Sequence, residues 1–221
     1  MRRFDLVAFD VDGTLVEHPD GRTVWEVLNE TITGSRDQNR ERLAMYRAGT
    51  LTYADWVALD VGSWRDAGAT RGELVAAFAP LRLVNGARET MDALKKEGAR
   101  LAVISGTLDL LLDTLFPDHP FDDVYTNRLT FDDAGRIASW WATPFDMDGK
   151  AEALRKIAAQ EGVPLSRCAF VGDHSNDLSA ARAAGFTVAF NPKCRELEEL
   201  AGAVVRSQDL RDVLPFLTFA A

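Results

Sequence analysis

The chain has 221 residues and a formal net charge of -9 at pH 7, and its pI is near 4.9. This excess of negative charge argues against non-specific binding to nucleic acid or to an anionic membrane, because both are themselves negatively charged. A hydrophobic content of 47% and a charged content of 27% are usual for a globular protein that buries a sizeable core.

The amino terminus begins like a signal peptide, with Met1-Arg2-Arg3, but Asp5 and Asp10 interrupt the apolar run that would have to follow. No apolar segment reaches the roughly 18 residues that span a bilayer. The two cysteines cannot form a disulfide framework, which favours a reducing compartment. We therefore expect a cytoplasmic protein that binds neither nucleic acid nor membrane.

The apolar run over residues 4–9 predicts a buried parallel strand that ends at Asp10. Ligands of open α/β sheets bind at the carboxyl ends of the strands, so Asp10 and Asp12 would both enter that crevice. Two carboxylates placed this close together repel each other unless a cation lies beside them, and Mg²⁺ prefers oxygen ligands of this kind. The alternative is a simple polar turn. An EF-hand is excluded because Gly13 stands fourth from Asp10, whereas that loop needs glycine at the sixth position.

Helical spacing of apolar residues, without any strand signal, runs from residue 22 to about residue 78. Glycine-containing breaks divide this region into short helices. We predict a helical cap at residues 19–79, inserted after the first strand into an α/β catalytic core made of residues 1–18 and 80–221. The alternative is an ordinary helical edge of the core.

The rest of the chain alternates predicted strands and helices. Strands are expected over residues 100–104, 122–125, 168–171, 186–190 and 203–205, and a β-hairpin over 128–140 around the turn at 132–135. The fold class is therefore α/β: a doubly wound, mainly parallel sheet with a Rossmann-like core, an inserted helical cap and a small β-hairpin.

Four polar signals fall at predicted strand ends or helix starts, and phosphoryl transfer gives each a role. Asp10 is predicted to be the nucleophile that forms an aspartyl-phosphate. Asp12, held by Thr14, would protonate the leaving alcohol and later activate water. The phosphoryl oxygens would be bound by Ser105, Gly106, Thr107, Lys150, Asn176 and Mg²⁺, with Asp10, Asp12, Asp173 and Asp177 at the metal. Each signal alone has a structural explanation, such as a solvated lysine or a helix cap.

These residues, in this order, resemble the four motifs of the haloacid dehalogenase-like hydrolases. The match consists of Asp10-Val-Asp12-Gly-Thr14-Leu, Ser105-Gly-Thr, Lys150 and Gly172-Asp173-x-x-Asn176-Asp177. The helical cap and the segment 126–129 before the hairpin make the chain most similar to the phosphoserine phosphatase group. The resemblance implies a magnesium-dependent phosphatase that works through an aspartyl-phosphate on Asp10.

The resemblance also implies where the substrate's alcohol part would be held. An alignment anchored on residues 49–53 puts Asp60 where the group has a cap arginine that binds the serine carboxylate, and Arg47 where an apolar residue is usual. Pro19 falls nearest the place of a glutamate that holds the amine. Both Arg47 and Asp60 are candidate substrate-binding residues. We expect a small phosphorylated metabolite, with phosphoserine one candidate and the departures favouring another ester.

Two other activities use similar residues. A phosphotransferase would pass the phosphoryl group from Asp10 to an alcohol instead of water. A receiver-like signalling domain also has a strand-end aspartate, a hydroxyl residue and a lysine, but it needs neither Asp12 nor a cap.

Overall fold

The computed structural model describes residues 3–219, so the outermost ends of the predicted core, residues 1–2 and 220–221, lie outside the described residues. Its centre is a seven-stranded sheet in the order β6-β5-β4-β1-β7-β8-β9. These strands are β1 (Leu6–Phe9), β4 (Arg100–Leu108), β5 (Asp123–Phe131), β6 (Ile137–Trp141), β7 (Cys168–Gly172), β8 (Phe186–Phe190) and β9 (Ala203–Val205). All neighbours are parallel except β5 and β6, which pair antiparallel as a hairpin. The predicted mainly parallel α/β sheet is confirmed.

The position of β1 explains how its end becomes a site. Every residue of this short apolar strand is buried, as expected for a strand in the middle of a covered sheet. Phe9 lies in register with Val103 of β4 on one side and with Val171 of β7 on the other. Residues that follow these three strands therefore meet at one edge of the sheet.

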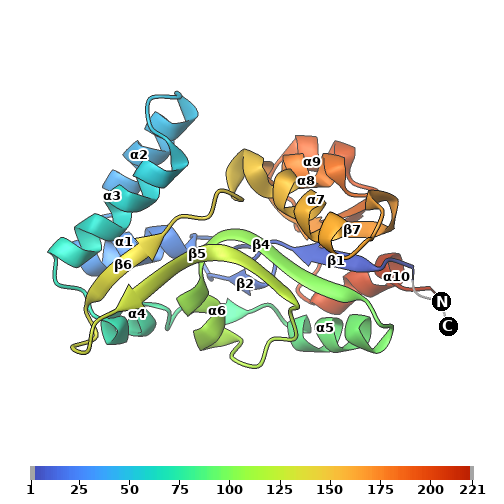
Figure 1. Cartoon of the computed structure of the whole chain (residues 1–221), viewed down its shortest axis with the longest axis horizontal. Coiled ribbons are helices and arrows are strands. Elements are labelled where there is room, and N and C mark those ends of the chain that lie inside the picture. The colour runs from blue at the N-terminus through green and yellow to red at the C-terminus, as the bar shows by residue number, and fades with distance from the viewer. Residues whose placement is uncertain (1–2, 220–221) are drawn as a thin grey trace.

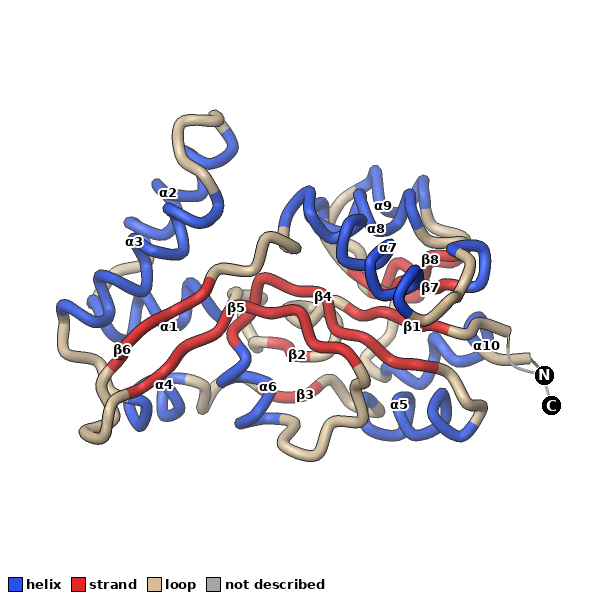
Figure 2. The backbone as a smooth tube through the Cα atoms, viewed as in Figure 1, coloured by secondary structure: helices blue, strands red, loops and turns tan. Residues whose placement is uncertain are grey.

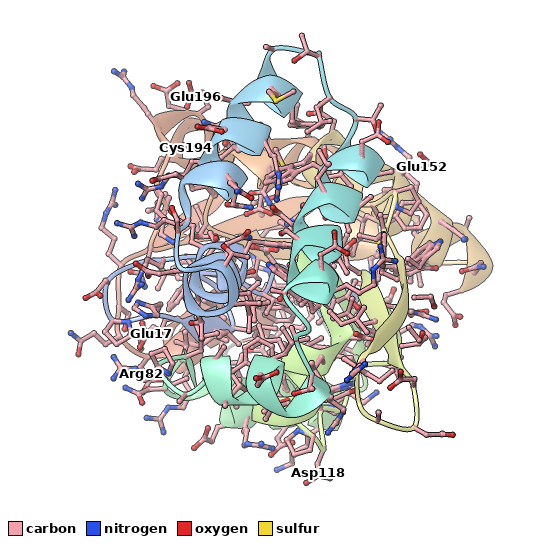
Figure 3. All side chains as sticks on the ribbon, turned by 90° about the vertical axis from the view of Figure 1, so that its left-hand side faces the viewer. Glu17, Arg82, Asp118, Glu152, Cys194 and Glu196 are labelled. Carbon is pink, nitrogen blue, oxygen red and sulfur yellow. The ribbon has the colours of Figure 1, made fainter. Side chains whose placement is uncertain are left out.

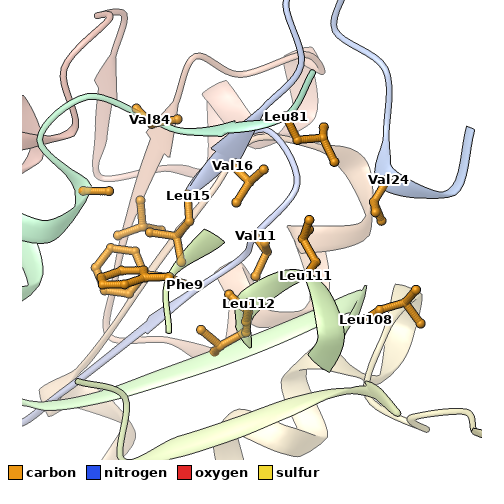
Figure 4. Packing of buried hydrophobic residues seen from close by; sticks show 14 of the residues in the cluster. Phe9, Val11, Leu15, Val16, Val24, Leu81, Val84, Leu108, Leu111 and Leu112 are labelled. Carbon is orange, nitrogen blue, oxygen red and sulfur yellow. The ribbon is translucent and has the colours of Figure 1, made fainter. Parts of the chain in front are cut away.

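Alternate residues of β1 face two different layers of helices. Val7 and Phe9 pack in one apolar cluster with residues of α5 (Ala87–Lys96), α6 (Asp109–Leu115) and α10 (Leu214–Leu217). Leu6 and Ala8 pack in a second cluster with residues of α7 (Lys150–Gln160) and α8 (Leu178–Ala183), beside which lies α9 (Arg195–Leu200). Figure 1 shows these helices on the two faces of the sheet, and Figure 4 shows the first cluster around Phe9, Val11 and Leu112.

A helical insert follows β1, as predicted. It consists of α1 (Val24–Thr33), α2 (Asp37–Arg47), α3 (Tyr53–Asp66) and α4 (Arg71–Ala77). Thr23, Thr52 and Thr70 each cap a helix start by accepting a backbone N–H, which explains where α1, α3 and α4 begin. The insert stands at one end of the sheet, and α2 and α3 project furthest (Figure 2). It leaves and rejoins the core through the antiparallel strands β2 (Val16–Glu17) and β3 (Arg82–Leu83).

Two local predictions were wrong, and one pair of strands was not predicted. Residues 16–17 form β2 because they pair with β3 far along the chain. The predicted strand at 122–125 and the first arm of the hairpin are one continuous strand, β5. Finally, β4 does not end at Ser105 but continues to Leu108, with a register shift between Ile104 and Leu108.

Short 3₁₀ turns complete the structure at Met147–Gly149, Leu165–Arg167, Ser175–Asp177 and Leu210–Val213. Between Arg3 and Phe219, no helix is long and apolar enough to cross a membrane.

Candidate active site

Asp10 lies directly after β1 at the carboxyl edge of the sheet, and the residue is only 3% exposed. Its backbone N–H donates to the carbonyl of Val171 (3.0 Å), which continues the pairing of β1 with β7. Gly13, in the turn after Asp10, has a φ of +89°, and a Cβ at this position would lie 2.2 Å from Asp173 Oδ2. Glycine is therefore required at this position, both for the left-handed backbone and for the close approach of the two strand ends.

Lys150 lies beneath Asp10, fully buried as the first residue of α7. Its Nζ is 2.6 Å from Asp10 Oδ1 and 2.7 Å from Asp177 Oδ1. Burial alone would lower the pKa of this ammonium group, but the Asp10 and Asp177 carboxylates raise it above its ordinary value. Lys150 is thus held as a cation against the predicted nucleophile.

Asp10, Asp173 and Asp177 each offer a carboxylate oxygen, and these atoms lie within 4.8 Å of one another. Two backbone N–H groups, of Asp173 (2.8 Å) and His174 (3.0 Å), donate to Asp177 Oδ2 and fix this carboxylate. Asp173 is 1% exposed, and its Oδ1 accepts no hydrogen bond from any residue between 3 and 219. A buried carboxylate oxygen without a partner, in an all-oxygen group, fits a hard divalent cation such as Mg²⁺.

Asp12 was also predicted at the metal, but its carboxylate lies outside this group of three. Its Oδ1 instead accepts the backbone N–H of Val24 (3.1 Å), the first residue of α1. Burial, followed by the nearby Asp10 carboxylate, raises the pKa of Asp12 to about 7. Such a group can hold and release a proton near neutral pH. The expectation that Thr14 holds Asp12 is wrong, because the buried Thr14 hydroxyl has no hydrogen-bond partner among the described residues.

The segment Ser105, Gly106 and Thr107 lies in the irregular part of β4. Ser105 is 2% exposed, and its Oγ accepts the N–H of Thr107 (3.3 Å). A Cβ on Gly106 would lie 1.9 Å from Asp146 Oδ2 and 2.8 Å from the Tyr53 hydroxyl, so a side chain there would displace both groups. The Gly106 carbonyl accepts hydrogen bonds from Trp25 Nε1 (2.8 Å) and Asn127 Nδ2 (2.6 Å). The insert and the core hairpin therefore jointly fix this peptide.

A cavity of about 320 Å³ opens above these groups, between the sheet edge and the insert. Among the predicted residues, those that line it are Asp10, Asp12, Arg47, Ser105, Gly106, Thr107, Asp173 and Asn176. Lys150 and Asp177 do not line it but contact Asp10 or its neighbours from below. Asp60 does not line it either: it is fully buried in the insert, where it accepts hydrogen bonds from Asn39, Arg42 and Trp56.

Several residues of the site were not predicted from the sequence. The Lys193 Nζ lies 2.7 Å from Asp173 Oδ2, and Lys193 also lines the cavity. Trp25 and Asn39 bring an indole and an amide from the insert. Asn127 lies in the segment that marked the resemblance to phosphoserine phosphatases, which was the one available signal for its role. The others follow no local pattern.

Comparison with known proteins agrees with this geometry. A family described as haloacid dehalogenase-like hydrolase matches residues 4–185. Phosphoserine phosphatase SerB2 of Mycobacterium tuberculosis is 34% identical over 95% of the chain and 49% of its own length, so the chain spans about half of that relative. Phosphoserine phosphatase of Methanocaldococcus jannaschii is 29% identical over 96% of the chain and 97% of its own length.

Solved structures give the same result for the fold. A phospho-aspartyl intermediate analogue of phosphoserine phosphatase superimposes with a TM-score of 0.78 at 27% identity, covering 98% of this chain and 100% of that one. A substrate-bound phosphoserine phosphatase complex gives a TM-score of 0.74 at 25% identity, covering 99% of this chain and 100% of that one. The protein is thus a phosphoserine phosphatase-like member of the haloacid dehalogenase-like hydrolase family.

Proposed function

We propose that this protein is a magnesium-dependent phosphomonoesterase that hydrolyses a small phosphorylated metabolite through an aspartyl-phosphate on Asp10. The observation that carries the proposal is the position of the Asp10 carboxylate. It lies at a cavity wall, with Lys150 Nζ 2.6 Å from one of its oxygens and with Asp173 and Asp177 beside it.

In the first step an Asp10 carboxylate oxygen forms a bond to phosphorus while the bond from phosphorus to the ester oxygen breaks. Asp12, whose pKa is raised to about 7, donates its proton to the departing alcohol. In the second step Asp12 takes a proton from water as the water attacks the aspartyl-phosphate. Asp12 is thereby reprotonated, inorganic phosphate leaves, and the Asp10 carboxylate is restored.

The remaining residues of the site bind and orient the phosphoryl group. The Ser105 hydroxyl and the backbone N–H groups of the segment 105–107 would donate to its oxygens, and Asn176 would do so from the opposite wall. Asp10, Asp173 and Asp177 would hold Mg²⁺, which supplies positive charge for the phosphoryl oxygens. We propose that residues 19–79 form a cap domain that keeps bulk water from this site, over a core of residues 1–18 and 80–221.

Phosphoserine is one candidate substrate, because the relatives bear that name. Arg47 lines the cavity and forms no ion pair with any residue between 3 and 219, so its guanidinium is available to an anionic substrate group. Asp60, at the aligned position of the cap arginine, offers nothing to a carboxylate. We therefore expect an ester other than phosphoserine to be hydrolysed fastest.

The test is phosphate release from a panel of phosphomonoesters, phosphoserine included, with Mg²⁺ and with a chelator. We expect Mg²⁺-dependent release that is lost in Asp10→Asn and kept in Asp132→Asn, a change in the exposed hairpin turn. Acid quenching during turnover should trap one phosphoryl group on Asp10. Release that persists in Asp10→Asn would refute the mechanism. New phosphate esters formed from added alcohols would instead identify a phosphotransferase, and a phosphoenzyme that lasts for hours would identify a receiver-like domain.

A further inference from the structure

Helices α2 and α3 are joined at the cavity wall by a buried polar cluster made of Asn39, Arg42, Trp56 and Asp60. Asp60 is its centre, with no solvent exposure. Its carboxylate accepts hydrogen bonds from Asn39 Nδ2 (2.6 Å) and Trp56 Nε1 (3.0 Å), and it pairs with the Arg42 guanidinium. Figure 3 looks onto these two helices, which run side by side at the outer end of the molecule.

This cluster fixes the orientation of the Asn39 amide. A carboxylate only accepts hydrogen bonds, so the NH₂ group of Asn39 must face Asp60 and the amide oxygen must point away from it. Asn39 is 4% exposed and lines the cavity. Within residues 3–219, no group donates a hydrogen bond to its Oδ1. Asn39 therefore presents a hydrogen-bond acceptor to the cavity.

The other residues on this side of the cavity do not satisfy that acceptor. Trp25, Leu43 and Trp56 also line the cavity, but the indole N–H groups of the two tryptophans are already bonded to Gly106 and Asp60. Arg40 lines it as well, and its guanidinium is paired with Glu26. When a substrate displaces water from this wall, the Asn39 oxygen loses its hydrogen bonds unless the substrate brings a donor.

We infer that Asn39 Oδ1 accepts a hydrogen bond from the alcohol part of the substrate, and that Asp60 is the positioning residue that keeps this oxygen in the cavity. The inference rests on the proposed function and names the substrate class. The preferred substrate is a phosphate monoester whose alcohol part carries a hydroxyl or ammonium donor. An ester whose only second group is a carboxylate brings an acceptor to an acceptor at Asn39, so this contact favours the donor-bearing esters over it.

The test uses three-carbon esters of matched size: glycerol 3-phosphate, 3-aminopropyl phosphate, 3-phosphooxypropanoate, whose only second group is a carboxylate, and propyl phosphate. We expect kcat/KM for glycerol 3-phosphate or 3-aminopropyl phosphate to exceed that for propyl phosphate by roughly tenfold, mainly through KM. The better of the two distinguishes a hydroxyl from an ammonium donor. In Asn39→Leu this ratio should fall to near one.

Two further variants separate this role from a structural one. Asn29→Leu changes another fully buried asparagine of the insert, one that does not line the cavity, and should keep the wild-type ratio. Asp60→Asn allows the Asn39 amide to turn over and offer its NH₂ group. This variant should lower the preference for donor-bearing esters and raise kcat/KM for 3-phosphooxypropanoate relative to propyl phosphate. A general loss of folding would move all four esters together.

The inference is overturned if wild-type protein hydrolyses propyl phosphate as well as the donor-bearing esters, or if Asn39→Leu keeps their ratio. It is also overturned if Asp60→Asn keeps the wild-type unfolding midpoint and yet lowers all four rates equally. These results differ from failure of the proposed function, in which p-nitrophenyl phosphate and every ester of the series remain intact in the presence of Mg²⁺.

Discussion

The indole N–H of Trp25, in the insert, donates a hydrogen bond to the carbonyl oxygen of Gly106, in the core, over 2.8 Å. The same carbonyl accepts from Asn127, so the peptide that follows Gly106 has one orientation. The Trp25 ring also stacks on Trp64 at 5.2 Å, which fixes the indole from the insert side. The placement of α1 is therefore coupled to the segment that would bind the phosphoryl group.

Trp25→Phe removes this N–H while keeping an aromatic ring against Trp64. We expect kcat/KM to fall about tenfold, because loss of a net hydrogen bond of about 1 to 1.5 kcal/mol loosens the Gly106 peptide. Steady-state kinetics on the best ester measures it. Trp64→Phe is the control, since it changes the stacking partner without touching Gly106. Equal losses in the two variants would show that ring packing, rather than the hydrogen bond, matters.

Lys150→Met leaves the Asp10 and Asp177 carboxylates buried without their cation. We expect loss of activity by at least about 10³-fold and a lower free energy of unfolding, by roughly 3 to 5 kcal/mol at neutral pH without metal. Denaturant unfolding and initial rates measure the two effects. Lys156→Met removes an exposed lysine from the same helix and should change neither by much. Activity of Lys150→Met near the wild-type level would contradict the assigned role.

Asp12→Asn removes the proton carrier but keeps the side-chain shape. Alkyl phosphates need a protonated leaving group, so their hydrolysis should fall by roughly 10² to 10⁴-fold. p-Nitrophenolate, the leaving group of p-nitrophenyl phosphate, departs without a proton. With this ester, only the second step should be slow in Asp12→Asn. We therefore expect a burst of p-nitrophenolate equal to the enzyme concentration, followed by slow turnover. An equal loss on both ester types, with no burst, would argue against acid-base catalysis by Asp12.

The buried carboxylates also predict how the stability of the metal-free protein depends on pH. Burial raises the pKa of Asp12 from 3.8 to about 7. Burial, followed by the nearby Asp10 carboxylate, also raises the pKa of Asp173. Between these pH values the folded chain binds more protons than the unfolded chain, so stability falls as the pH rises, by up to about 1.4 kcal/mol per unit for each such group.

In chelator, we therefore expect the unfolding midpoint to be lower at pH 7.5 than at pH 5, by at least roughly 5 °C. Mg²⁺ should stabilise the protein more at pH 7.5, because the cation replaces protons on the acidic group. Asp12→Asn should have a shallower pH dependence in chelator. A midpoint that rises from pH 5 to 7.5 in chelator would contradict the raised pKa values of the buried carboxyl groups. A midpoint that does not respond to Mg²⁺ would contradict the metal site.

The sequence determined the parts of this protein that depend on local patterns and strand order. Apolar runs placed β1 and β7 inside a parallel sheet, and in such a sheet the residues after neighbouring strands must meet. Asp10 and Asp173 could therefore be assigned to one site before their separation was known. The lysine at the start of α7 followed from the same order. Helical spacing likewise predicted the insert, although not the strands β2 and β3 that carry it.

Only the tertiary structure decided the contacts between residues whose positions follow no local pattern. Lys193 reaches Asp173 because β8 lies beside β7, and Trp25 reaches Gly106 because α1 lies against the bulged end of β4. Asp60 looked from its aligned position like a substrate contact, yet it is buried behind Asn39 and orients that amide. Hydrophobic periodicity reports which face of an element is buried, but a hydrogen bond depends on distances of a few tenths of an ångström between side chains from different elements.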